Sequence, residues 1–224
     1  IVRWLALAKN LVWEDTGKKS IITRIESKLH HPPPPPLKER INNVLHRLKI
    51  QSDKLEQTAD RLQSRDKELF DRCVKAMMVK DEARAAMYAN EIAEVRKMAR
   101  IIIRSQLALE QVTMRLETVE ELGDMMVQMG PVVGVVKAIN GQLAGVIPEV
   151  AGELESINDV LNGVVLEAGD VTGRQHDIKV SDEEARNVLN EANAVAEQRM
   201  KDHFPELPTG LLPPGIGVPQ KSSL

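Results

Sequence analysis

The chain has 224 residues, of which 28% are charged and only 2% aromatic, and its formal net charge is -3. This composition is typical of helical rods, which pack small and aliphatic side chains along seams, and it argues against a globular enzyme core. No run of 18 apolar residues occurs, so no transmembrane helix is expected, and the single cysteine, Cys73, excludes an intrachain disulfide and favours a reducing cytoplasm.

The small net charge hides an uneven distribution. Residues 1–80 hold 17 Lys and Arg against 10 Asp and Glu, a net of +7, and residues 81–224 hold 13 against 23, a net of -10. This asymmetry predicts attraction of the front of the chain to an anionic surface, and attraction between the two parts within or between molecules. Because aromatic residues are not interleaved with the cations, we expect no binding of nucleic acid.

Residues 1–36 form the first predicted segment. Residues 1–13 fit a short amphipathic helix whose tryptophans, Trp4 and Trp13, suit a water–lipid boundary. There are two alternatives: this helix packs on the rest of the chain, or the start of the sequence is altered, since its first residue is Ile. The five residues Pro32–Pro36 predict an extended polyproline spacer.

Residues 37–129 are the periodic part of the chain. Apolar or small residues recur at steps of four and three from Ile41 to Ala76, and again from Tyr88 to Leu116. This spacing gives each helix one buried face. We therefore predict an all-α fold built on a long antiparallel hairpin, with helices over 37–79 and 82–129, a turn in which Asp81 caps the second helix, and Cys73 buried on the stripe.

Basic residues recur every seven positions along the first helix of this hairpin. They are Arg40, Arg47, Lys54 and Arg61, which we call the basic strip. The spacing places them along one side of the rod, where they would contact anionic lipid or an acidic partner. A solvated face is the plainer alternative.

Shorter helices are predicted after the hairpin. Gly130 and Pro131 should break the second helix and act as a hinge, with weak helices over 131–148 and a further helix over 149–167 making up the segment 130–169. In the segment 170–203, a linker precedes an acidic regulatory helix that opens at Ser181 with a capping box. Residues 204–224 read as a mobile Leu/Pro tail that serves as a docking peptide.

No motif for catalysis or for a cofactor occurs in the chain. Metal-spaced Cys and His pairs, nucleophile elbows and phosphate-binding loops are all missing from the sequence. We therefore expect no enzyme activity, no metal and no cofactor.

The order of these elements resembles one protein family. The stretch from Arg61 to Leu122, which opens RLQSRDKELF and closes RLETVEEL, continues into IPEVAGELESINDVLN and then into the acidic helix from Ser181. Over about residues 40 to 205 it resembles the ESCRT-III family, most closely its archaeal Cdv cell-division branch. Since no winged-helix extension follows, the resemblance is to the shorter paralogues.

The resemblance implies how such a chain works. Subunits with five or so helices are soluble while their acidic C-terminal helices fold back on the hairpin. They polymerise with themselves and with paralogous subunits on membranes when those helices release. The resemblance places membrane contact on the basic strip. It also implies that an AAA ATPase docks by its MIT domain and dismantles the polymer. The tail resembles the proline-type docking motif for that domain, at Phe204, Pro205, Leu207, Pro208 and Leu211.

The predicted function is therefore a filament-forming subunit that constricts and severs membranes, in archaeal cell division or in vesicle budding. Its expected place is the cytoplasmic face of the cell membrane at the division site. The alternative is a structural coiled-coil or adaptor protein with no direct role in membrane remodelling. The basic strip together with the acidic C-terminal third favours the first, because a simple coiled coil needs neither.

Overall fold

The computed structural model of the chain describes residues 35–118, 122–172 and 178–205, although the side chains of 122–128, 170–172 and 178–181 lie outside that description. The chain divides into two units, Ile1–Pro36 and Leu37–Leu224. Trp4, Trp13 and three of the five prolines, residues 32–34, fall outside the described residues. The predictions made for them therefore stay predictions.

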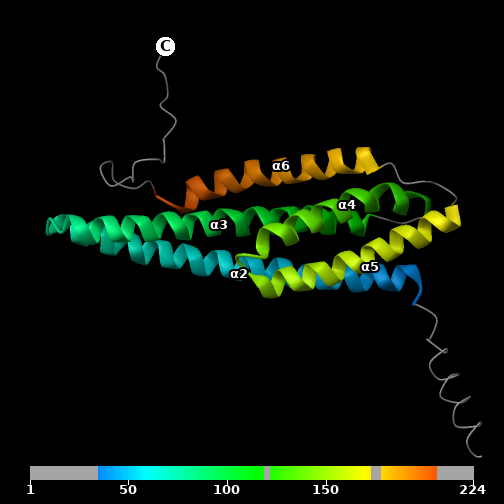
Figure 1. Ribbon diagram of the computed structural model, residues 1–224, viewed down its shortest axis with the longest axis horizontal. Coiled ribbons are helices and arrows are strands. Elements are labelled where there is room, and N and C mark those ends of the chain that lie inside the picture. Colours follow the sequence, from blue (N-terminus) through cyan, green and yellow to red (C-terminus); the bar gives the residue numbers. More distant parts are fainter. Residues whose placement is uncertain (1–34, 119–121, 173–177, 206–224) are drawn as a thin grey trace, which may run out of the picture. The chain divides into compact units, whose positions relative to one another are not determined.

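The described residues form five helices and no strand (Figure 1). They are α2 (Leu37–Met78), α3 (Glu82–Glu117), α4 (Leu122–Leu143), α5 (Pro148–Thr172) and α6 (Ile178–His203). This confirms the predicted all-α fold, with a long hairpin followed by shorter helices.

The hairpin consists of α2 and α3, which run antiparallel. Lys49 pairs with Glu117 toward one end, and the Cys73 thiol donates to the Ala85 carbonyl toward the other. With a rise of about 1.5 Å per residue, α2 is roughly 63 Å long. The predicted turn is confirmed, because Asp81 caps α3 by accepting a hydrogen bond from the backbone N–H of Arg84.

Two apolar clusters hold the helices together. The larger contains residues of all five helices, and in α2 it takes up the predicted stripe residues Ile41, Leu48 and Leu55. The smaller cluster lies in the half of the hairpin next to the turn between α2 and α3, which we call the outer half. It contains residues of these two helices alone: Leu69, Cys73, Ala76, Ala85, Ala89, Ile92 and Val95. In that outer half the core is therefore a two-helix seam.

The predicted break at Gly130 and Pro131 is wrong. The second helix of the hairpin ends at Glu117 rather than near residue 129, and α4 runs through both Gly130 and Pro131 without interruption. Thr118 closes α3 by donating its hydroxyl to the Arg115 carbonyl. The predicted weak helices after residue 131 are likewise replaced by the continuous α4.

Burial explains why the helix breaks earlier. The apolar residues of α4, among them Met129, Val132, Val136 and Ile139, belong to the larger cluster. A helix continuing straight from α3 would carry Ile139 about 33 Å beyond Glu117, away from that cluster. Folding α4 back antiparallel on α3, where Arg104 donates to Gln142, buries these side chains instead.

The last two helices are longer than predicted. α5 extends to Thr172, and α6 begins at Ile178, so Ser181 lies inside a helix and the predicted capping box at Ser181 is wrong. α6 is antiparallel to α3, since Glu184 pairs with Arg115 and Glu197 with Arg100. Figure 1 shows α6 alongside α3 and α5 alongside the N-terminal half of α2.

Candidate functional site

Three of the four residues of the basic strip form ion pairs with α5. These contacts also place α5 antiparallel to α2, with the start of α5 near Lys54 and its later part near Arg40. The contacts join Arg40 Nη1 to Glu167 Oε2 at 2.5 Å, Arg47 Nε to Glu153 Oε1 at 2.8 Å, and Lys54 Nζ to Glu149 Oε1 at 3.0 Å; Arg47 Nη2 also donates to Ser156 Oγ at 2.8 Å.

The sequence of α5 explains this arrangement. Its apolar residues at helical spacing, among them Leu154, Ile157 and Leu161, are fully buried in the larger cluster. Glu149, Glu153 and Glu167 flank that face and so reach the strip. A glycine helps at one point, because a Cβ at Gly163 would lie only 2.9 Å from Nη2 of Arg40.

The cover is tightest at Arg40. The exposed fraction of the cationic side chain rises from 16% at Arg40 and 22% at Arg47 to 43% at Lys54. Arg61 lies beyond the start of α5 and has no ion-pair partner among the described residues. Because partly exposed ion pairs each contribute about 0–1 kcal/mol, apolar burial rather than charge holds α5 in place.

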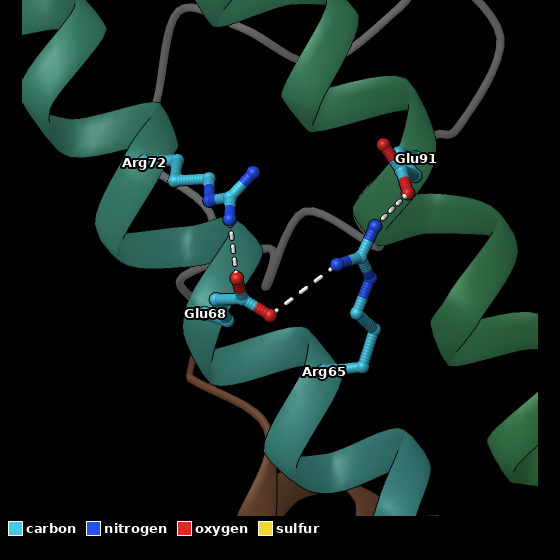
Figure 2. A network of polar contacts seen from close by, with 4 residues as sticks. All are labelled: Arg65, Glu68, Arg72 and Glu91. Atoms are coloured by element: carbon cyan, nitrogen blue, oxygen red, sulfur yellow. Dashed lines mark hydrogen bonds and ion pairs between the residues drawn. The ribbon is translucent and has the colours of Figure 1, made fainter.

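Beyond Arg61 the same side of α2 carries a mixed network (Figure 2). Glu68 accepts from both Arg65 and Arg72, and Glu91 of α3 accepts from Arg65 at 2.8 Å. The hydrogen bond to Glu91 raises the pKa of the Arg65 guanidinium, which stays charged. Two carboxylates therefore balance two guanidinium groups, and this part of α2 carries no excess positive charge.

Phe204 does not belong to a free tail. Its side chain is 6% exposed and lies in the larger cluster, with its ring centroid 6.0 Å from Cζ of Arg96. Arg96 in turn donates to both oxygens of the buried Asp66, at 2.7 and 3.0 Å. The prediction of a mobile tail over residues 204–224 is therefore wrong for Phe204, which is part of the core.

The other predicted docking residues are placed only in part. Pro205 is exposed, and Leu207, Pro208 and Leu211 lie outside the described residues. Sequence reasoning gave no role to Arg96 and Asp66, although Asp66 interrupts the apolar stripe of α2. The sequence did contain a signal for this pair: an acidic residue lies on the buried stripe of α2, and the partner helix has a basic segment opposite it.

No group of His, Cys, Asp and Glu among the described residues could hold a metal ion. Among the described helices, none combines the length and the apolar character needed to cross a membrane.

Comparisons with known proteins agree with the resemblance. No protein-family model matches the chain, and no solved structure does. The chain is 45% identical over 187 residues to cell division protein B1 of Sulfolobus acidocaldarius, covering 84% of this chain and 86% of that protein. It is 36% identical over 172 residues to cell division protein B of the same organism, covering 77% of this chain and 66% of that protein.

A third relative from the same organism, cell division protein B3, is 29% identical over 117 residues, covering 52% of this chain and 68% of that protein. One organism thus has several related proteins of this type. The extent of the first match, together with the five-helix fold, shows that the chain belongs to the cell division protein B family, the archaeal Cdv branch of ESCRT-III.

Proposed function

We propose that the chain is an ESCRT-III-like subunit that acts in cell division by polymerising on a membrane, which the polymer constricts and severs. The observation that carries this proposal is the pairing of Arg40, Arg47 and Lys54 with carboxylates of α5. Relatives that are named cell division proteins support the process. The proposed place of action is the cytoplasmic face of the cell membrane, and no catalytic step is involved.

The cations of the basic strip would gain similar free energies from anionic lipid and from the glutamates of α5. Each Lys or Arg near an anionic membrane contributes about 1 kcal/mol. A partly exposed ion pair with glutamate contributes a similar amount, about 0–1 kcal/mol. Since the two are nearly balanced, the glutamates of α5 and anionic headgroups compete for the same cations. Displacement of α5 would free the strip for lipid.

Assembly and disassembly complete the proposal. Paralogous subunits of the same family are the proposed co-assembling partners, as the relatives within one organism suggest. An AAA ATPase would dock on the tail through its MIT domain. Because Phe204 is buried, docking on the closed chain would begin at the exposed Pro205 and include Phe204 only after the end of α6 has moved.

The test changes the cover and leaves the strip intact. In the full chain, Glu149→Gln with Glu153→Gln removes two of the three carboxylates and should increase sedimentation with anionic vesicles several-fold. The matched control is Glu155→Gln with Asp159→Asn, two exposed acids of α5 that pair with no residue of α2 in the described part. Both variants change the net charge equally.

The outcomes separate the hypotheses. An equal gain in the control would show that net charge alone drives binding and would overturn the role of α5. Adding Arg40→Gln, Arg47→Gln and Lys54→Gln to the variant without Glu149 and Glu153 should abolish its increased sedimentation with anionic vesicles. Electron microscopy of the variant without Glu149 and Glu153 on vesicles should show filaments. If no variant binds or assembles, the chain is a structural coiled-coil or adaptor protein.

A further inference from the structure

The tip of the hairpin exposes apolar side chains that no other helix covers. Met78, the last residue of α2, and Val79, the first of the turn, are 77% and 76% exposed. Met77 beside them is 38% exposed. The smaller apolar cluster next to the tip contains only residues of α2 and α3, so the tip extends beyond the five-helix core.

The backbone of the tip is fixed rather than open. The N–H of Asp81 bonds to the Ala76 carbonyl and the N–H of Lys80 to the Met77 carbonyl, both at 2.9 Å. These two bonds form a Schellman motif, in which the residue at the position of Lys80 takes a left-handed conformation. Lys80 has a φ of 57°, where glycine is the usual residue. Met78 and Val79 are thus held outward by a closed turn.

Cations surround this apolar point. Lys75 and Lys80 are exposed, and neither has an ion-pair partner among the described residues. Between residues 72 and 84 there are four cations and two acids, but Arg72 pairs with Glu68 and Arg84 with Asp81, which also caps α3. The two lysines therefore face one further acid, Glu82. The tip therefore presents two adjacent apolar side chains between two free ammonium groups.

The size and shape of the tip decide which partner it fits. A stable protein interface buries about 800 Å² on each partner, which two or three side chains at a convex end cannot supply. A lipid surface needs no complementary shape, and it accepts apolar side chains below a ring of Lys residues whose stems lie along the interface. The excess of cations favours anionic over neutral lipid.

We infer that the hairpin tip is a lipid-contacting point, which inserts Met78 and Val79 into an anionic membrane surface while Lys75 and Lys80 remain at the headgroups. The inference shares the membrane with the proposed function but concerns a different site. The basic strip must lose its α5 cover to bind lipid, whereas the tip is accessible in the closed chain. The tip would thus make the first contact.

The experiment uses full-length protein and vesicles of phosphatidylcholine with phosphatidylglycerol in equal parts. Met78→Asp with Val79→Asp should lower the bound fraction about tenfold. Two single variants, Met78→Asp and Leu166→Asp, make the same kind of change at different sites. They show whether a loss of binding depends on the tip or only on replacing an exposed apolar side chain with an acid. Leu166 is 71% exposed on α5, beside Glu167, whose partner Arg40 lies about 57 Å along α2 from Met78. Leu166→Asp should leave binding unchanged.

A second measurement reports insertion directly. An environment-sensitive fluorophore on Val79→Cys, in a Cys73→Ala background, should shift to the blue on binding. Lipids brominated along the acyl chain should quench it. The same fluorophore on Leu166→Cys should stay in water. A probe at residue 79 that stays unquenched while the chain binds vesicles overturns the inference.

The remaining outcomes are equally distinct. If Arg40→Gln with Arg47→Gln and Lys54→Gln abolishes binding while the tip variants bind normally, the tip inference fails and the strip stands. If the tip variants weaken self-association in the absence of vesicles to the same degree, the tip is a contact between copies, and the lipid inference also fails. Absence of vesicle binding by every form overturns both proposals.

Discussion

Asp66 is a buried carboxylate in the hairpin, 1% exposed and held by two hydrogen bonds from Arg96. Removing one member of a buried pair leaves the other charge uncompensated, which costs about 3–5 kcal/mol. Asp66→Ala should therefore lower the free energy of unfolding by that amount, as measured by chemical denaturation.

The control for Asp66 is its half-exposed neighbour Arg65. Arg65→Ala removes two ion pairs of the network in Figure 2 but should lower the free energy of unfolding far less than Asp66→Ala, because water screens both pairs. Replacing both buried partners, with Asp66→Leu and Arg96→Met, should recover much of the stability lost in the single variant. Equal losses for Asp66→Ala and Arg65→Ala would contradict a buried pair.

The buried thiol of Cys73 makes stability depend on pH. Burial without a charged partner raises the pKa of Cys73 in the folded chain above its unfolded value of about 8.5. The unfolded chain therefore loses this proton first as pH rises. The contribution to stability is complete below about pH 8.5 and is lost as pH rises through the folded pKa.

Denaturation midpoints measured from pH 7 to 10 should accordingly fall more steeply for the unchanged chain than for Cys73→Ala. The native thiol should also react slowly with a maleimide until the chain unfolds. Identical pH profiles for the two proteins would show that the thiol is not desolvated.

Among the elements, α6 depends on a close approach to α4. A Cβ placed on Gly134 would lie 3.0 Å from the Cβ of Ala185 in α6. Gly134→Leu should push α6 away, cost about 1–3 kcal/mol, and increase hydrogen exchange along α6. Gly141→Leu is the matched control, because a Cβ there meets nothing within 4 Å. Unchanged exchange in Gly134→Leu would mean that α6 does not rely on this contact.

At the scale of the molecule, α5 and α6 cover different surfaces of the other helices. α6 packs on α3 and α4 and brings Glu184 and Glu197 to Arg115 and Arg100, whereas α5 covers the basic strip. Their loss should therefore have different consequences. Removing α6 exposes apolar surface of α3 and α4, whereas releasing α5 exposes three cations of α2 together with apolar surface.

A chain ending at Arg174 should thus self-associate more than the full chain, because the apolar surface of α3 and α4 under α6 becomes accessible. Analytical ultracentrifugation checks this. Binding to anionic vesicles through the strip should not rise unless Glu149 and Glu153 are also neutralised. A truncated chain that stays monomeric would show that α6 does not restrain assembly.

The local signals in the sequence were sufficient for α2 and for the turn of the hairpin, but not for the end of α3 at Glu117. The stripe from Ile41 to Ala76 determined the buried face of α2, and Asp81 determined where α3 begins, since both depend on contacts within a few residues or along one seam. The family followed from the order of these elements. The seven-residue spacing of Arg40, Arg47 and Lys54 correctly placed them on one side of α2.

Tertiary structure decided the rest. Gly130 and Pro131 read as a helix break because local propensity disfavours them, yet burial of the apolar side chains around them keeps them inside α4 and moves the break to the end of α3. Phe204 read as tail because prolines follow it, yet Arg96 and the core hold it. The sequence by itself determined which cations share a face. Only the packed structure decided that α5 covers three of them, because that pairing joins residues 95 to 127 positions apart.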